Sequence, residues 1–514
     1  MTCKDSYVMR SCLLVLSLVL MMSLTACSND DKDIHNVSVS SPAAAADSDD
    51  ESPLQLVWLT VDYWAEDKMT GERLKAANAR IRELGYDFEV SFQGISDETY
   101  ETYQKGIEEV KKNKQGDLMW TGLGDGDAPE KEGTYYRQIQ LGNLKPLDKW
   151  MKTDLGRTLK DQYSPLEWKR VTYKNHIYGV RNMKEQGVFT CLILTGDQIN
   201  SSGLNGKTDL SVRELYQWLE EYRKNPEHKF YLDWNYMNDY NTSFSELGYI
   251  KLCDGIYMTP EGTVENVWEN EDICQLWMCF TSMKKAGQLV CDDSDGLDQT
   301  YQGKYTAALI NMTGENMDGS YLYQPDGAKV PVESHTVAVP FLNKIENDVH
   351  GVTSWSEYPD EAMQLLTLVN TDKELANLLY FGLEGKDYQL KDGVAYTEKF
   401  PDTYCPANPK ITYFNQYEAN GSGEKEAYYK KVNQRYQLSP ADGFVPNLKK
   451  AGARDELLKE VESFYKTLLE GNDDPKKSIQ KFQKKLKNQK YESVLKNVQR
   501  QYDNWKKRRA KSEG

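Results

Sequence analysis

The chain has 514 residues, enough for about three domains, and 39% of them are hydrophobic, with 34 Tyr and 11 Trp. This aromatic content is too high for a disordered chain. The 63 Lys and Arg against 79 Asp and Glu give a net charge of −16, which disfavours nucleic-acid binding because phosphate repels an acidic chain. The composition also excludes a polytopic membrane protein and a small disulfide scaffold.

Residues 1–26 have the organisation of a secretory signal. Lys4 and Arg10 precede an apolar stretch from Leu13 to Leu24, which is shorter than the roughly 20 residues of a spanning helix. The sequence that follows, Leu24-Thr25-Ala26-Cys27, resembles the bacterial lipobox. That resemblance implies cleavage before Cys27, lipidation of Cys27 and attachment to the outer face of the cell membrane. The alternative is an ordinary signal peptide.

Residues 27–53 are predicted to form a flexible acidic tether. They include Asp30, Asp31, Asp33 and the run Ala43–Ala46, and almost nothing in the segment is available for burial. Loss of residues 1–26 would leave 61 Lys and Arg and 78 Asp and Glu, a net charge of −17.

The cysteines give one firm expectation. Cys191 lies in the apolar run 188–194, which predicts a buried strand and a free core thiol. Export permits disulfides, and pairing stays open for five others: Cys253, Cys274, Cys279, Cys291 and Cys405. No CxxC motif is present, so a zinc ribbon or thioredoxin-like site has no support.

The first 70 residues after the tether predict a βαβαβ unit. Strands are expected at 54–60, 88–92 and 118–121, with helices at 74–84 and from an N-cap at Ser96 to 110. Such units form mainly parallel sheets, whose ligands bind outside the carboxyl ends of the strands. The loops after Thr60 and Thr121 are therefore the first places to look for a site.

Later segments continue an α/β pattern. Helices are predicted at 212–223, 360–368 and 373–379, and strands at 305–312 and 336–341.

Taken in order, several motifs resemble the extracellular solute-binding proteins of bacterial ABC importers, closest to the maltose-binding-protein-like carbohydrate group. They are the lipobox and the segments 56–59, 116–122, 144–148, 176–180 and 303–309. The tail, from Gly443-Phe444-Val445-Pro446 to Trp505, resembles a C-terminal extension of one Gram-positive subgroup.

The resemblance implies a type II periplasmic-binding-protein-like fold: two α/β lobes of mixed, mostly parallel sheets flanked by helices, with C-terminal helices. One lobe would comprise residues 54–180 and 351–430, and the other 181–350 and 431–514. The implied function is capture of a carbohydrate, expected to be an oligosaccharide, in the cleft between the lobes and its delivery to an ABC permease. No catalysis, cofactor, metal or nucleic acid is implied, and the chain is expected to be a monomer.

Candidate ligand-binding residues follow from strand ends and from the presumed lobe crossings. Aromatic rings cover the apolar faces of a sugar, and charged side chains bond its hydroxyl groups. The expected set is Trp58, Asp62, Trp64, Gly122, Asp125, Arg181, Asn182, Asn311, Trp355 and Ser356. Trp58 could equally be a core residue, and the loop 121–127 a solvated acidic turn.

Other readings stay open. One alternative is a secreted carbohydrate-active enzyme, because the chain has enough carboxylates to supply a glycosidase pair. A peptide or lipid-headgroup receptor on the same fold is a third candidate. The segment 291–296 resembles a calcium loop but fails as an EF-hand, because Cys291 and Gln302 stand where acidic ligands are required.

The tail has its own charge signature. Residues 475–514 contain 14 Lys and Arg and 3 Asp and Glu, a net charge of +11, which leaves −28 for the rest of the mature chain. Apolar residues recur three and four apart from Ile479 to Trp505, which predicts amphipathic helices with a basic outer face. That face could be solvated, with the helices docked on the acidic second lobe, or could contact anionic lipid or wall polymer.

Overall fold

The structure is a computed structural model, and it describes most of the chain from Pro53 onward. The described residues are 53–62, 64–65, 69, 71–96, 98–122, 134–184, 186–233, 244–291, 300, 303–312, 321–323, 329–343, 348–398, 404–416, 418 and 425–513. The predicted signal, Cys27 and the tether up to Ser52 lie outside them. Residues 1–52 and 53–514 are separate units, and only the second is described below.

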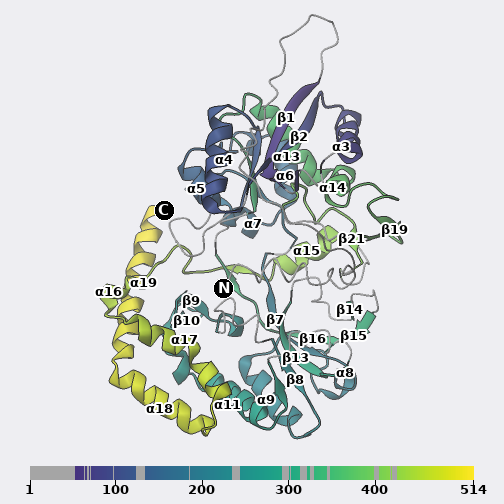
Figure 1. Cartoon of the computed structure of the whole chain (residues 1–514). Coiled ribbons are helices and arrows are strands. Elements are labelled where there is room, and N and C mark those ends of the chain that lie inside the picture. The colour runs from purple at the N-terminus through teal and green to yellow at the C-terminus, as the bar shows by residue number, and fades with distance from the viewer. Residues whose placement is uncertain are drawn as a thin grey trace, which may run out of the picture. The chain divides into compact units, whose positions relative to one another are not determined.

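A five-stranded sheet organises the first part of the chain, in the order β2-β1-β3-β18-β6. Figure 1 labels two of its strands, β1 and β2, side by side. Strands β1 (Leu54–Val61), β2 (Phe88–Ile95) and β3 (Leu118–Thr121) are parallel, which confirms the predicted βαβαβ unit. Strand β18 (Val349–Val352) enters from much later in the sequence and pairs antiparallel with both β3 and β6 (Val180–Arg181). The sheet is therefore mixed at one side.

Helices cover this sheet. Helices α3 (Gly71–Glu83) and α4 (Tyr100–Lys112) follow β1 and β2 as predicted, and α3 packs on α14 (Lys373–Tyr380). The cap of α4 is Thr99, not the expected Ser96, because Thr99 and Thr102 form a reciprocal capping box at the backbone. The other elements of this part are α5 (Thr134–Gln140), η1 (Trp150–Lys152), α6 (Asp154–Asp161), α7 (Pro165–Arg170), β4 (Thr172–Tyr173), β5 (His176–Ile177) and α13 (Pro359–Thr371).

The first hydrophobic core is built from two stretches of the chain that are far apart in sequence. It runs from Leu56 to Val180 and then from Val349 to Ala407. A small sheet with its own apolar cluster follows, formed by β19 (Gln389–Lys391), β20 (Val394–Tyr396) and β21 (Phe414–Asn415). Helix α15 (Lys425–Asn433) comes next in the chain.

A second five-stranded sheet has the order β12-β8-β13-β7-β16. Its strands are β7 (Phe189–Leu194), β8 (Phe230–Leu232), β12 (Leu289–Val290), β13 (Ala307–Met312) and β16 (Glu333–Ala338). Cys191 is fully buried in β7, as predicted, and burial raises the pKa of its thiol to about 12. Helices α9 (Val212–Tyr222) and α11 (Glu271–Lys285) pack on each other beside this sheet.

The smaller elements of this part are short. They are α8 (Gln198–Ser201), η2 (Ser245–Leu247), β9 (Ile250–Cys253), β10 (Ile256–Met258), β11 (Val264–Glu265), η3 (Val267–Glu269), β14 (Tyr321–Tyr323), β15 (Lys329–Pro331), β17 (Phe341–Leu342) and β22 (Gln437–Leu438).

The C-terminal helices belong to the second hydrophobic core. They are α16 (Leu448–Ala451), α17 (Asp455–Glu470), α18 (Pro475–Asn488) and α19 (Tyr491–Glu513). Phe464 of α17 stacks on Phe482 of α18, with ring centroids 3.8 Å apart, and both lie in one apolar cluster with Trp268 and Trp277. The predicted amphipathic helices are confirmed, and their apolar face is buried in the second core.

Buried polar side chains tie together the segments that connect the two cores. The Arg170 guanidinium donates to the backbone oxygens of Asn343 and Gln186, and the Asn433 side chain bonds the backbone at Lys184 and Gln186. Burial lowers the pKa of Arg170 to about 9, and the charge of Arg181 acts in the same direction. Three stretches distant in sequence are thus joined by hydrogen bonds.

A second network lies beside the first. The Glu418 carboxylate accepts from Lys184 Nζ at 2.6 Å and pairs with Lys425 Nζ at 2.9 Å, and all three side chains are buried or nearly so. Burial alone would raise the pKa of Glu418, but the two ammonium groups outweigh it and hold the pKa low.

None of the described helices is long and apolar enough to cross a membrane.

Candidate ligand-binding site

The carboxyl ends of β1, β3 and β6 lie at one edge of the first sheet, together with the amino end of β18. Val349 of β18 pairs with Thr121 at the end of β3 and with Arg181 at the end of β6. Because β18 is antiparallel to both, the residue that precedes it belongs to the same edge. This edge therefore carries Asp62, Gly122, Arg181 and Asp348, and we call it the first strand edge.

Asp62 follows β1 directly and lies over Gly94 of the neighbouring strand β2. A Cβ atom placed on Gly94 would fall 2.5 Å from Asp62 Oδ1 and 2.6 Å from its Cα. Any side chain at position 94 would displace Asp62, so the glycine sets where this carboxylate lies. Asp62 is partly exposed, as a ligand-binding carboxylate must be.

Gly122 has a similar relation to Trp120. A Cβ atom at position 122 would overlap the Trp120 indole, so the ring lies directly against the end of β3. The ring of Tyr404 meets Trp120 edge to face, with centroids 5.1 Å apart. Tyr404 is partly exposed, so it adds aromatic surface to the first strand edge, and sequence reasoning missed it.

Asp348 was also missed. Its backbone is in the left-handed region, with φ of 58°, a conformation in which Asp is enriched. Burial raises the pKa of its carboxyl group, and Arg181 and Trp120 act in the opposite direction. The first strand edge thus combines two carboxylates, a guanidinium and aromatic rings, which are the groups that bond hydroxyls and cover C–H faces.

The two tryptophans predicted near β1 are core residues. The Trp58 side chain is 0% exposed, and its indole N–H donates to His350 Nδ1 at 3.2 Å. Trp64 is 1% exposed and meets Phe92 edge to face at 5.1 Å. Trp58 is therefore a core residue, which was the alternative to a binding role. Trp64 is also buried and packs beneath the first strand edge, so its ring is not part of the exposed surface there.

Asn182 is committed to internal hydrogen bonds. Its side-chain oxygen accepts from the Tyr163 hydroxyl at 2.8 Å, and its amide donates to the backbone oxygen of Pro406. The side chain is buried, so its position favours a structural role: it fixes the backbone next to Arg181 rather than contacting a ligand directly.

Trp355 and Ser356 lie at the opposite edge of the sheet, which corrects the expectation that they share a site with Asp62. The Trp355 indole donates to the Gln115 backbone oxygen at 2.6 Å, and Ser356 Oγ donates to Asp117 Oδ1 at 2.6 Å. Gln115 and Asp117 precede β3. The physical reason is the antiparallel direction of β18, which carries the chain away from the carboxyl ends of β1 and β3.

The second sheet has a corresponding edge, which we call the second strand edge. Asn311, near the end of β13, accepts from Thr190 Oγ1 at 3.0 Å and donates to Glu246 Oε1 at 2.5 Å. With Asp233, which follows β8, these residues line a recess of about 10 Å³, room for about one water. Asn311 was predicted; Asp233 and Glu246 were not.

Asp125 and the calcium-like segment after Cys291 fall outside the described residues, as does Cys27. Within the described ranges, no group of three or more His, Cys, Asp and Glu side chains could hold a metal ion.

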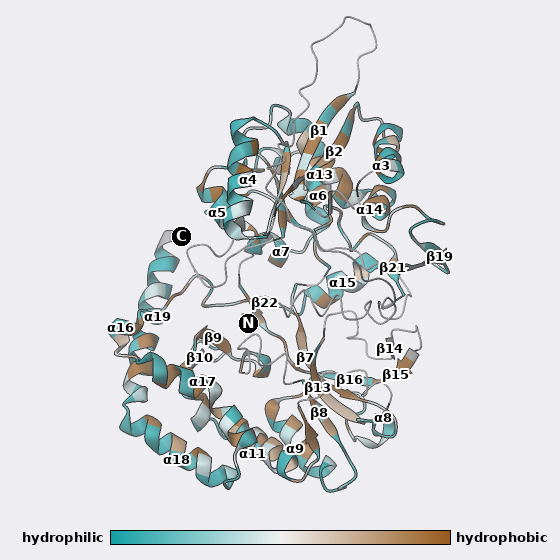
Figure 2. Ribbon diagram, viewed as in Figure 1, coloured by the Kyte–Doolittle hydropathy of each residue, from teal (hydrophilic) through white to brown (hydrophobic). Residues whose placement is uncertain are grey.

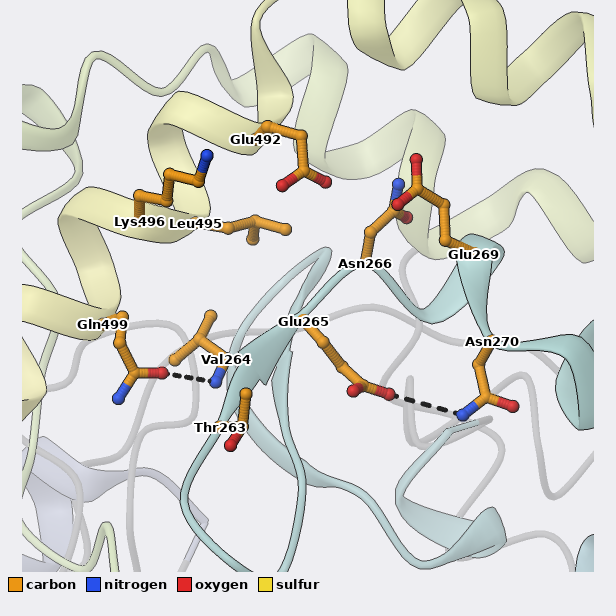
Figure 3. Close-up of a pocket in the computed structure, with 10 residues that line it drawn as sticks. All are labelled: Thr263, Val264, Glu265, Asn266, Glu269, Asn270, Glu492, Leu495, Lys496 and Gln499. Atoms are coloured by element: carbon orange, nitrogen blue, oxygen red, sulfur yellow. Dashed lines mark hydrogen bonds between the residues drawn. The ribbon is translucent and has the colours of Figure 1, made fainter.

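The larger grooves lie away from both strand edges. One of about 430 Å³ separates β11 and η3 from α19, and its lining includes Glu265, Asn266, Glu492 and Lys496 (Figure 3). The Gln499 side chain of α19 bridges this groove by accepting from the backbone N–H of Val264 at 2.6 Å. Another groove of about 510 Å³ borders β19 and β20. Neither contains a predicted site residue.

Comparison with solved structures identifies the architecture. The N-glycan transport solute binding protein NgtS of Streptococcus pneumoniae aligns with 88% of this chain and 99% of its own, with a TM-score of 0.56 at 18% sequence identity. The chain has the fold of a solute-binding protein. An HMO-binding, ABC-transporter-associated solute-binding protein from Bifidobacterium longum infantis aligns over 89% of this chain and 100% of its own, with a TM-score of 0.50 and 14% identity. The predicted two-sheet α/β architecture is thereby confirmed.

Sequence comparison adds two findings. A carbohydrate ABC transporter substrate-binding protein of Streptococcus pneumoniae serotype 4 is 29% identical over 163 residues, which is 30% of this chain and 33% of that relative. The match thus spans about a third of the length of the relative. Residues 440–507 match a family model described as a domain of unknown function, DUF3502, which confirms the predicted C-terminal extension. These relatives are named as binding and transport proteins rather than as enzymes.

Proposed function

We propose that the chain is an extracellular, lipid-anchored receptor that captures an oligosaccharide and delivers it to an ABC importer. The observation that carries the proposal is the combination of a solute-binding-protein fold with a first strand edge rich in carboxylates, a guanidinium and aromatic rings. The named relatives support a carbohydrate ligand, because they are described as carbohydrate and glycan transport proteins.

The proposed ligand lies between the two strand edges. Asp62 and Asp348 accept hydroxyl protons, Arg181 donates to ring and hydroxyl oxygens, and Tyr404 covers a C–H face. From the second strand edge, Asn311 and Glu246 contact the far side of the sugar. Sites of this kind occur preferentially between structural units.

The division into lobes follows the hydrophobic cores. One lobe comprises residues 54–181 and 348–430, which moves the expected boundaries at 180 and 351 by a few residues so that β6 and β18 are both kept whole. The other comprises 182–347 and 431–514. Residues 182–188, Asn343 and 433–436 form the crossing between them, where hinge closure around the ligand is expected.

Anchoring through Cys27 rests on the sequence Leu24-Thr25-Ala26-Cys27. Replacement of Cys27 with Ala releases the chain from membranes in this account, and membrane retention of the variant would contradict it. The remaining proposals are a monomeric receptor and a permease partner.

The test of function is a thermal-shift screen of glycans, followed by analysis of the recovered ligand. A true receptor is stabilised by RT ln(1 + [L]/Kd) and returns the glycan unchanged. Stabilisation by oligosaccharides with full recovery supports the proposal. Hydrolysed products at enzymatic levels would favour a carbohydrate-active enzyme, and stabilisation by peptides or lipid headgroups alone would favour another receptor class.

A further inference from the structure

Helices α18 and α19 carry a concentration of positive charge that the proposed sugar site does not use. Residues 475–514 have a net charge of +11, whereas the whole chain has −16, so residues 1–474 carry −27. A protein with this separation of charge has a strong preferred orientation in an electric field.

The positive side chains of α18 face solvent. Ile479, Phe482 and Leu486 bury the apolar face of the helix in the second core. Lys477, Lys481 and Lys484, at positions i, i+4 and i+7, lie on the opposite face and are exposed. Figure 2 shows most of α18 in the hydrophilic colour.

Helix α19 repeats the arrangement. Val494, Val498 and Tyr502 are buried, while Arg500 is exposed on the opposite face. Lys496 is also exposed but borders the groove beside β11. A further five basic residues fill the last turns: Lys506, Lys507, Arg508, Arg509 and Lys511.

Few of the basic side chains of α18 and α19 are neutralised by acidic neighbours among the described residues. Lys485 pairs with Glu460 of α17, and Arg509 donates to the Asp442 backbone oxygen. Lys477, Lys481 and Lys484 form no ion pair with any residue in the part of the chain that the structure describes. The apolar face of the helices is docked on the second core, and the basic face is outward, where it is open to solvent or to a negatively charged surface.

We infer that the exposed basic face of α18 and α19 is a docking surface for an anionic lipid bilayer. This rests on the proposed function, because the anchor at Cys27 holds the chain near a membrane. The acidic remainder is repelled by an anionic surface while the basic helices are attracted, so the bilayer orients the receptor.

The electrostatic attraction between these basic residues and an anionic membrane is strong enough for a reversible contact. A Lys or Arg near an anionic membrane surface contributes enough to change binding about fivefold. Several such residues together would hold the helices at the surface, and salt would release them because the attraction is screened within about 10 Å at 0.1 M.

The test is vesicle sedimentation with the chain from Cys27 to Gly514 carrying Cys27→Ala, so that no lipid anchor contributes. One set of vesicles is phosphatidylcholine alone, and the other also contains phosphatidylglycerol. We expect binding only to the second set and its loss at high salt. The triple variant Lys477→Gln, Lys481→Gln, Lys484→Gln should bind at least about tenfold more weakly.

A matched control removes the same charge elsewhere. Lys75, Lys105 and Lys112 are exposed on α3 and α4, and their replacement by Gln should leave vesicle binding unchanged. Equal losses in the two triple variants, or binding to soluble poly(glycerol phosphate) but not to vesicles, would overturn the inference. Glycan binding measured on the same preparations reports on the sugar site alone, so failure of one proposal is distinguishable from failure of the other.

Discussion

His350 is a buried base that the fold keeps neutral. Its Nδ1 accepts the Trp58 indole hydrogen bond inside the first sheet, and burial lowers the pKa of the imidazole to about 3. In the unfolded chain the pKa returns to its ordinary value of 6.5. The unfolded state therefore binds the extra proton as the pH falls below 6.5, and the free energy of unfolding decreases until the pH approaches 3.

This effect is measurable by urea unfolding. Between pH 7 and pH 5 the wild type should lose about 2 kcal/mol more stability than His350→Gln, which keeps an acceptor for Trp58 but does not titrate. An unchanged pH dependence in His350→Gln would mean that His350 is not the group responsible.

Gly94 is predicted to act on ligand binding through Asp62. Gly94→Ala places a methyl group where the Asp62 carboxylate and backbone lie, so we expect binding of the selected glycan to weaken about tenfold or more. The double variant Gly94→Ala, Asp62→Ala should bind no worse than Asp62→Ala alone, because both changes remove one interaction. Calorimetry of the three variants gives the comparison, and additive losses would show that Gly94 acts by another route.

Among single residues, those that sequence reasoning located correctly follow parallel strands. Asp62 and Gly122 lie where the carboxyl ends of β1 and β3 were expected. Sequence reasoning leaves Trp58 open between core and site and favours the site for Trp64, which the structure buries. An aromatic ring beside a strand end serves a core and a binding surface equally well. Asp348 could have been found only from the direction of the strand that follows it.

At the scale of elements, local periodicity was reliable and strand direction was not. The apolar spacing predicted α3, α4, α9, α13, α14 and the C-terminal helices, since those patterns depend on neighbours three and four residues apart. The pairing of β18 with β3 and β6 joins residues more than 160 positions apart, and no local signal encodes its antiparallel sense. Trp355 and Ser356 were expected at the site because they follow a presumed lobe crossing, and their position at the other end of the sheet depends on the direction of β18.

The Glu418 network is predicted to hold the crossing segments together. Glu418→Gln leaves Lys184 and Lys425 as buried charges without their carboxylate, so we expect a loss of about 3–5 kcal/mol in the free energy of unfolding. The pKa of Glu418 is held below its ordinary value of 4.5 in the folded state, so its contribution is present above pH 4.5 and is lost as the pH falls through the lower, folded value.

Denaturant unfolding at neutral pH checks the magnitude. Glu357 is exposed, and Glu357→Gln should change stability by less than about 0.5 kcal/mol. If Glu418→Gln were as stable as that control, the network would have no structural role in the crossing.

The whole molecule combines three properties: a solute-binding-protein fold, a polar and aromatic strand edge, and a separation of charge between the C-terminal helices and the rest. A ligand at the first strand edge should depend on Asp62 and not on Trp355, and a ligand at the opposite edge of the same sheet should depend on Trp355 and not on Asp62. Asp62 lies at the carboxyl ends of the parallel strands, whereas Trp355 lies beyond their amino ends and bonds Gln115.

The most direct test is calorimetric titration of the glycan selected by the thermal-shift screen into wild type, Asp62→Ala and Trp355→Ala. A hydrogen bond to a charged group is worth about 1.5–3 kcal/mol, so Asp62→Ala should weaken binding by about 10- to 150-fold. Trp355→Ala should bind with wild-type affinity, and each chain should take up one glycan. Normal affinity in Asp62→Ala together with loss of binding in a folded Trp355→Ala would place the ligand at the other edge of the sheet and contradict the account.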